Sequence, residues 1–324
     1  MDGPQFGLGL AALGRPGYIN LGHAEDLNRD YSVEAMQLQA HGVLDVAWQA
    51  GVRYFDVARS YGKAELFLGT WMRKRNITAD EVAVGSKWGY TYTADWKVQT
   101  PEGVAHEVKR HELDVLQRQH AESLDTLGEH LSLYQIHSAT IDSGVMDNTE
   151  VLDHLAALRD HGLKIGFSVS GPNQSETIEK ALSINSESGK LFDSVQATWN
   201  LLERSAGPAL QRAHDSGLSV IVKESLANGR LTTRNSKPEF ESKLALLKKT
   251  ASSLDTTVDA LSLAAVWNQP WVSIVLGGAS TSDHLLSNIA AANFDWADAT
   301  FRELDLLTEN SQEYWSCRSA LAWN

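Results

Sequence analysis

The feature that most constrains the fold is an alternation of short apolar runs with longer amphipathic stretches along the chain. Each run is short enough to be a buried strand, and each stretch between two runs has helical periodicity. The candidate strands cover residues 6–13, 53–57, 82–87, 131–137, 163–168, 194–198, 218–222 and 271–276. The candidate helices cover residues 32–50, 63–75, 106–127, 147–161, 174–183, 205–216, 257–268 and 281–292.

This alternation predicts parallel strands joined by crossover helices. With eight such repeats in 324 residues, the most economical closure is an α/β fold of the (β/α)8 TIM-barrel type. An open, doubly wound sheet is the alternative. No Pro/Gly/Ser-rich linker and no internal repeat divides the chain. We therefore expect a single domain over residues 1–324, with substrate loops and a C-terminal tail at the C-terminal face of the barrel.

The composition argues against several classes of function. Lys and Arg number 28 against 41 Asp and Glu, and the resulting charge of −13 argues against non-specific binding to nucleic acid or to an anionic membrane. A phosphate-bearing ligand must then be captured locally, against the overall field. The single cysteine, Cys317, excludes an internal disulfide. The N-terminal residues lack the pattern of a signal peptide and no apolar run could cross a bilayer, so we expect a cytoplasmic protein.

Polar residues end several of the predicted strands, where a barrel carries its reactive groups. Asp56 ends the second strand, Lys87 the third and His137 the fourth, while Tyr61 lies in the loop after Asp56. A tyrosine with a pKa of about 10 becomes a better acid–base catalyst when a nearby ammonium group favours its phenolate. Asp56 could hold Lys87 in place, and His137 could donate to a carbonyl oxygen. Together these groups suit the polarisation and protonation of a carbonyl.

The segments that carry these residues resemble those of the aldo-keto reductase superfamily, and the resemblance covers nearly the whole chain. It rests on Gly-Leu-Gly-Leu at 7–10, Asp-x4-Tyr-Gly at 56–62, Gln-Ile-His at 135–137, Gly-Phe-Ser at 166–168, Gln196 with Asn200, and Leu-Ala-Asn-Gly-Arg-Leu at 226–231. It implies direct hydride transfer between a nicotinamide cofactor and an aldehyde or ketone, or the corresponding alcohol, without a metal. Tyr61 would be the general acid or base, Lys87 and Asp56 would tune its pKa, and His137 would orient the carbonyl.

The same resemblance implies a set of cofactor contacts. Ser168 and Gln196 would hold the nicotinamide carboxamide, and Lys223 stands where the family often stacks an aromatic ring. The backbone of residues 225–231 would contact the pyrophosphate, and residues 276–288 the adenosine. The full set is Ser168, Gln196, Lys223, Ser225, Leu226, Gly229, Leu231, Gly278, Ser280, His284 and Asn288.

The identity of the cofactor depends on how the 2′-phosphate would be held. Gly278, Ser280 and His284 occupy positions where basic residues commonly grip that phosphate. The frequency of NADP(H) in the family favours NADP(H), whereas these substitutions keep NAD(H) open.

Two short motifs point to other chemistries. Gly-Leu-Gly-Leu-Ala-Ala at 7–12 satisfies a dinucleotide-binding fingerprint, but Gly-Arg-Pro-Gly follows where the phosphate-binding helix should run. His106 and His111 resemble a zinc-binding pair, yet residues five apart lie about 140° apart around a helix and cannot share a metal. We interpret the segment of the two histidines as a solvated helix face.

Substrate contacts should come from loops at the barrel mouth. Tyr18, Trp88 and Trp199 are the candidates from the first, third and sixth loops. A large aromatic carbonyl or a sugar ring would suit such walls. Further aromatic residues lie in the segment 88–105 and in the tail, where they could line a pocket or an interface: Tyr90, Tyr92, Trp96, Tyr314, Trp315 and Trp323.

Three functions fit the sequence. The first is a carbonyl reductase, and the second is an NAD-dependent dehydrogenase of a sugar or a pyridoxal-like alcohol. The third is a redox sensor or regulatory subunit that binds nicotinamide with little turnover. The complete set of four residues favours catalysis over the third. The sequence does not indicate an oligomeric state.

Overall fold

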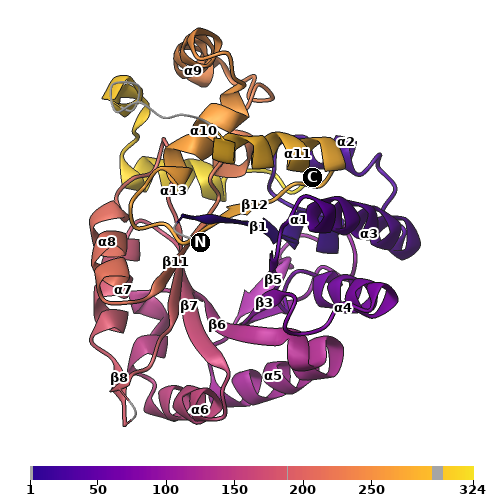
Figure 1. Cartoon of the computed structure of the whole chain (residues 1–324), viewed down its shortest axis with the longest axis vertical. Helices are drawn as coiled ribbons and strands as arrows, with labels where there is room; N and C mark the ends of the chain where they lie inside the picture. Colours follow the sequence, from indigo (N-terminus) through magenta and orange to yellow (C-terminus); the bar gives the residue numbers. More distant parts are fainter. Residues whose placement is uncertain (1–2, 188, 294–301) are drawn as a thin grey trace.

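Eight parallel strands close into a barrel surrounded by helices in the computed structural model, which describes residues 3–187, 189–293 and 302–324 (Figure 1). Around the barrel the strands follow the order β1-β12-β11-β10-β7-β6-β3-β2. Their bounds are β1 (Gln5–Gly9), β2 (Tyr54–Asp56), β3 (Ala83–Trp88), β6 (Leu131–Ala139), β7 (Lys164–Val169), β10 (Ser194–Thr198), β11 (Ser219–Lys223) and β12 (Ile274–Gly277). Each strand overlaps a predicted run, so the TIM barrel is confirmed and the open sheet is not formed.

Residues 11–14 are helical, so the first predicted strand, residues 6–13, extended too far. The described helices otherwise match the predicted positions, except that those at residues 11–14, 23–26, 241–253 and 311–319 were not predicted. The helices are α1 (Ala11–Gly14), α2 (His23–Asp26), α3 (Val33–Gln49), α4 (Ala64–Arg75), α5 (Leu113–Leu127), α6 (Thr149–Asp160), α7 (Gln174–Leu182), α8 (Gly207–Asp215), α9 (Glu241–Ser253), α10 (Val258–Trp267), α11 (Ser282–Ala290) and α13 (Ser311–Ser319). Short 3-10 helices are η1 (Gly128–His130), η2 (Ile141–Ser143), η3 (Val145–Asp147), η4 (Ala227–Gly229), η5 (Pro238–Phe240), η6 (Ala291–Asn293) and η7 (Leu304–Leu307). None of the described helices has both the length and the apolar character needed to cross a membrane.

The prediction of a helix from residue 106 was wrong at its beginning. Residues Glu107–Lys109 form strand β5, which pairs antiparallel with β4 (Tyr90–Tyr92) above the barrel. The aromatic and β-branched residues of β4 favour this pairing over a helix. His111 is buried, and His106 stacks on Trp323 with ring centroids 4.0 Å apart, so neither histidine lies on a solvated helix face. A second small hairpin joins β8 (Asn185–Ser186) to β9 (Gly189–Lys190).

The alternation of side chains along the strands decides which residues enter the barrel. Tyr54, Leu133, Ile221 and Leu276 form a small apolar cluster of their own. Glycine is required beside Tyr54, because a Cβ at Gly7 would come within 2.8 Å of its ring. Asp56, Gln135 and Lys223 each lie two residues after a member of this cluster, on the same inward face. Further polar residues stand near the C-terminal ends of β3, β6 and β10: Lys87, His137 and Gln196.

The C-terminal tail is fastened across the barrel mouth. Helix α13 packs Tyr314 and Trp315 into an apolar cluster shared with α9 and α10. Beyond this helix, Asn324 exchanges two backbone hydrogen bonds with Tyr18, of 3.1 and 3.2 Å. The first loop and the last residue of the chain therefore form one side of the mouth.

The buried His111 makes stability depend on pH. Burial and the charge of Lys109 lower the pKa of His111 to about 4, while its Nε2 donates to the carbonyl of His137 at 2.9 Å. Between pH 6.5 and 4 the unfolded chain binds a proton that the folded chain does not, so stability falls as the pH falls through this window. We expect His111→Gln to remove on the order of 3 kcal/mol of that fall.

Urea denaturation at several pH values measures this effect. His161→Gln, which replaces an exposed histidine, is the control and should leave the dependence of the free energy of unfolding on pH unchanged. Equal pH slopes for His111→Gln and the unsubstituted protein would contradict the prediction.

Candidate active site

A cavity of about 530 Å³ lies at the C-terminal ends of the barrel strands. Its walls come from strand ends, from the loop after β1, from residues 223–234, and from the segment that joins β12 to α11. A volume of this size is typical of small-molecule sites. Candidate catalytic and cofactor-binding residues both lie on its walls.

The innermost polar contact is an ion pair between Lys87 and Asp56. Lys87 is fully buried and Asp56 is 2% exposed. Lys87 Nζ contacts Asp56 Oδ1 and donates to the carbonyl oxygen of Val57 at 3.0 Å. Gln196 Nε2 donates to the second oxygen, Asp56 Oδ2, at 2.8 Å. The carboxylate is thus held from two sides, and the ammonium group has a fixed place beside the cavity.

Tyr61 lies next to this ion pair and also next to an arginine. Lys87 Nζ is 5.0 Å from the centroid of the Tyr61 ring, and the guanidinium carbon of Arg15 is 5.6 Å from it. Burial and the charge of Asp56 raise the pKa of Tyr61 well above its usual value, whereas Arg15 acts to lower it. The net shift in the pKa of Tyr61 is opposite to the one expected from a nearby ammonium group, because burial of the phenol and the negative charge of Asp56 outweigh the nearby positive charges.

His137 completes the group of four. Its ring meets the edge of Tyr61, with centroids 5.5 Å apart, and Tyr90 contacts it from another side at 4.9 Å. Its Nδ1 lies 3.5 Å from Ser60 Oγ. Burial and the positive charges of Lys87 and Lys223 hold the pKa of His137 well below its usual value. The imidazole is neutral at pH 7 as a result.

A second charged group lies on the opposite wall. Glu224 accepts from Arg318 Nε at 2.9 Å and lies 3.8 Å from Lys223 Nζ. Burial lowers the pKa of Lys223 to about 8. Although burial alone would raise it, the charges of Arg318 and Lys223 lower the pKa of Glu224 to about 2. This wall therefore carries a charged carboxylate between two cationic side chains.

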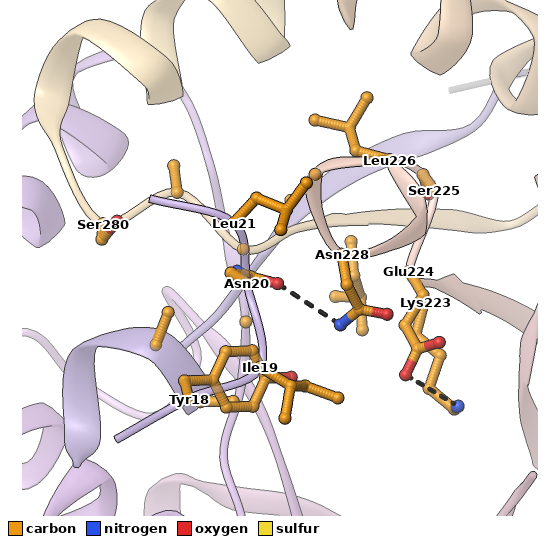
Figure 2. A pocket seen from close by; sticks show the side chains of 18 of the residues that line it. Tyr18, Ile19, Asn20, Leu21, Lys223, Glu224, Ser225, Leu226, Asn228 and Ser280 are labelled. Atoms are coloured by element: carbon orange, nitrogen blue, oxygen red, sulfur yellow. Dashed lines mark hydrogen bonds and ion pairs between the residues drawn. The ribbon is translucent and has the colours of Figure 1, made fainter. Parts of the chain in front are cut away.

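The loop after β1 and the loop after β11 meet over the middle of the cavity. Leu21 N donates to the carbonyl of Asn228 at 3.1 Å, and Asn228 Nδ2 donates to Asn20 Oδ1 at 3.3 Å. Figure 2 shows this contact, with Lys223 on one side of the cavity and Ser280 on the other. Gly229 allows the approach, because it has φ +88° and a Cβ there would stand 3.0 Å from Leu21. The cavity thus runs beneath a bridge between the two loops.

The Aldo/keto reductase family model matches residues 6–309 of the chain. The chain belongs to the aldo/keto reductase family. Members of this family are nicotinamide-dependent oxidoreductases that act on carbonyl groups. Membership therefore makes this protein an oxidoreductase of the same kind.

Similar proteins extend over most of the chain. The NADH-specific methylglyoxal reductase of Escherichia coli K12 is 24% identical over 318 residues, which cover 91% of each chain. The aldo-keto reductase str7 of Strobilurus tenacellus is 21% identical and covers 94% of this chain and 88% of its own. The solved structure of aldo-keto reductase AKR11C1 from Bacillus halodurans, in its holo form, has a TM-score of 0.69 at 19% identity, covering 94% of this chain and 92% of its own.

The aldo/keto reductase barrel of this chain brings most of the sequence-predicted site residues to one cavity. Lys87 lies behind its wall, in contact with Asp56. The predicted residues on the wall itself are Tyr18, Asp56, Tyr61, His137, Gln196, Lys223, Ser225, Leu226, Gly229, Gly278, Ser280, His284 and Asn288.

Four of the predicted residues lie away from the cavity. Trp88 is fully buried in the outer core and packs edge-on against His111 with centroids 5.5 Å apart. Trp199 packs against Trp271 in the same core. Leu231 belongs to the apolar cluster under α13, and Ser168 Oγ accepts from the backbone of Ser138 at 2.8 Å. Both tryptophans are buried, and neither lines the cavity.

Several cavity residues were not predicted from the sequence. Arg15 is buried between Tyr18, Tyr61 and Trp323, and it pairs with Glu107 at 2.8 Å. The other unpredicted charged residues on the wall are Asp26, Glu224, Arg234, Asp259 and Arg318. The only signal available in the sequence was the position of Arg15 and Glu224, each two residues beyond the end of a predicted strand.

Breaking the buried ion pair should destabilise the fold strongly. Asp56→Asn leaves the ammonium of Lys87 buried without a countercharge, so we expect the free energy of unfolding to fall by about 3–5 kcal/mol. Adding Lys87→Met to that variant removes the unpaired charge and should recover a large part of the loss. Chemical denaturation of the single and double variants measures both values.

Glu25→Gln provides the control, because Glu25 pairs with Arg29 at the surface. Exposed pairs contribute about 0–1 kcal/mol. A loss for Asp56→Asn as small as that of the control, or no recovery in the double variant, would contradict the role of the buried pair.

Proposed function

We propose that this protein reduces a small aldehyde or ketone with hydride from a nicotinamide cofactor, and that Tyr61 donates the proton. The observation that carries the proposal is the convergence of Tyr61, His137 and the Lys87–Asp56 pair beside one cavity. Such a set provides a proton donor, a neutral hydrogen-bond donor and a fixed positive charge.

The cavity fits the cofactor by its unsatisfied polar groups. Ser225 Oγ and Asn228 Oδ1 are buried on the wall and have no hydrogen-bond partner among the described residues. Buried polar groups are usually satisfied, so these two suit a polar ligand. Gly9, Gly277 and Gly278, which carry no side chain, also line the cavity. A nicotinamide cofactor bound in this cavity would supply the hydride that adds to the carbonyl carbon.

Tyr61 acts on the carbonyl oxygen. Its raised pKa keeps the phenol protonated, so it can donate as negative charge develops on that oxygen. Lys87 then stabilises the phenolate that remains. The reductase name carried by the E. coli relative supports reduction over the alternative of a dehydrogenase for a sugar or a pyridoxal-like alcohol.

His137 orients the carbonyl. Its lowered pKa keeps the ring neutral, and Ser60 contacts Nδ1. We assign the tautomer in which Nδ1 accepts from Ser60 and Nε2 donates to the carbonyl oxygen. A regulatory subunit with little turnover would not need this arrangement, so the complete set of four residues supports an enzyme.

The substrate would lie among aromatic and charged side chains. Tyr18, Tyr90 and Trp323 line the cavity, together with Arg15. The E. coli relative carries the name of a methylglyoxal reductase specific for NADH, so methylglyoxal is the first substrate to test. The frequency of NADP(H) among family members favours NADP(H) as the cofactor. The name of the E. coli relative, however, supports testing NADH beside NADPH.

Tyr61→Phe tests the proton donor. Loss of the hydroxyl should lower kcat/KM for carbonyl reduction by about 10²–10⁴-fold, the usual contribution of a general acid. The Kd for the reduced cofactor should stay within about twofold, because the ring itself is kept. Steady-state kinetics and fluorescence titration measure the two quantities. Tyr90→Phe removes a hydroxyl from another tyrosine of the cavity wall and is the matched control; near-normal turnover by Tyr61→Phe would disprove the role.

The pH profile tests the neutral state of His137. Its pKa lies well below 6.5 and that of Tyr61 well above 10, so neither group titrates near neutral pH. We expect kcat/KM for reduction to stay flat between about pH 6 and 7.5. An acidic limb with an apparent pKa near 6.5, absent from His137→Gln, would show that the imidazole is charged in the working enzyme.

A further inference from the structure

Four polar side chains from separate segments meet at one end of the cavity. Arg234 binds the carboxylate of Asp26 with both terminal nitrogens, at 2.9 and 2.5 Å. Ser280 Oγ donates to Asp26 Oδ2 at 2.9 Å, and His284 Nδ1 lies 3.6 Å from the same oxygen. All four residues line the cavity, and the Asp26 side chain is 10% exposed. We call this group the Asp26 cluster.

The Asp26 cluster lies at the end of the cavity away from Tyr61. Lys223 stands near the catalytic group, since its charge lowers the pKa of His137. In Figure 2, Ser280 lies across the cavity from Lys223, with Asn20, Leu21 and Asn228 between them. A dinucleotide is elongated, and its nicotinamide must lie beside Tyr61 to react. Its adenosine ribose would then reach toward Ser280 and Asp26.

The charges along the cavity leave no cation free for an extra phosphate. Within the described part of the chain, each lysine and arginine that lines the cavity pairs with a lining carboxylate. The pairs are Arg15 with Glu107, Lys223 and Arg318 with Glu224, and Arg234 with Asp26. Asp259 adds a further lining carboxylate, which accepts from Ser287 Oγ at 2.6 Å. A 2′-phosphate at this end would be repelled by the carboxylates of Asp26 and Asp259. Arg234 would offer little attraction, because Asp26 already compensates its charge.

The backbone around Asp26 is also held in place. Gln39 of helix α3 donates from Nε2 to the carbonyl oxygens of Asp26, at 2.9 Å, and Ser280, at 2.6 Å. This one amide therefore joins the segment after β1 to the segment after β12. The carboxylate of Asp26 is presented to the cavity without a rearrangement of either segment.

We infer that Asp26 makes this enzyme select NADH over NADPH, an inference that rests on the proposed function. A carboxylate accepts hydrogen bonds from the two hydroxyls of an unmodified ribose and repels a 2′-phosphate. Arg234 holds Asp26 in position and does not serve as a phosphate clamp. This preference for NADH differs from the expectation of NADP(H), which rested on how often family members use NADP(H).

Binding of each cofactor to the full chain, without any carbonyl compound, tests the inference. Calorimetric titration should give a Kd for NADH at least about tenfold below that for NADPH, because the repulsion acts only on the phosphorylated ribose. Asp26→Asn should shift the ratio of the two Kd values toward NADPH by about tenfold, because it removes the repulsion and releases Arg234. Asp26→Ser serves the same test if the asparagine variant does not fold.

Glu25→Gln is the matched control, since it removes an exposed charge from the same helix outside the cavity. Its ratio of Kd values should equal that of the unsubstituted protein. Tighter binding of NADPH that is lost in Arg234→Gln, or an unchanged ratio in Asp26→Asn, overturns the role of Asp26. If neither cofactor binds, the proposed function itself fails, whereas equal binding of both rejects only the selection by Asp26.

Discussion

The buried ion pair of Lys87 and Asp56 is the constraint on which the rest of the site depends. Two opposite charges inside a barrel are costly to desolvate and are tolerated only with good geometry and further hydrogen bonds. Here Gln196 and the carbonyl of Val57 supply those bonds. The barrel positions all of them, because strands β2, β3 and β10 each turn alternate residues inward. Tyr61 and His137 then meet a fixed charge at the barrel mouth.

Pairing of charges continues along the whole cavity and explains its electrostatics. The carboxylates of Asp56, Glu107 and Glu224 each pair with a cationic side chain, so the ionic groups of the cavity largely compensate one another. In such a site, local neighbours and burial decide each pKa, which is why His137 is neutral while Tyr61 keeps its proton.

Local patterns in the sequence were enough to predict the barrel and to place Asp56, Lys87 and His137 near the ends of strands. The periodicity of a strand and the residue at which it ends are both short-range features of the sequence. Side chains alternate between the two faces of a strand, and this explains why Trp88 does not line the cavity as predicted. Trp88 follows the inward Lys87 in the same strand, so its side chain points outward into the helix layer. By contrast, Arg318 meets Glu224 across 94 residues and Arg234 meets Asp26 across 208. Such partners come together only when the barrel closes, and no local pattern specifies them.

The segment after β1 connects the two ends of the cavity. Arg15 lies between Tyr18 and Tyr61 at one end, whereas Asp26 contacts Ser280 at the other end. Between them the segment is fastened to Asn228 on one side and to Asn324 on the other. Because Asn324 holds the same segment that carries Asp26, the position of Asn324 is coupled to both ends of the cavity. A loop that would otherwise be mobile is thereby made part of a preorganised site.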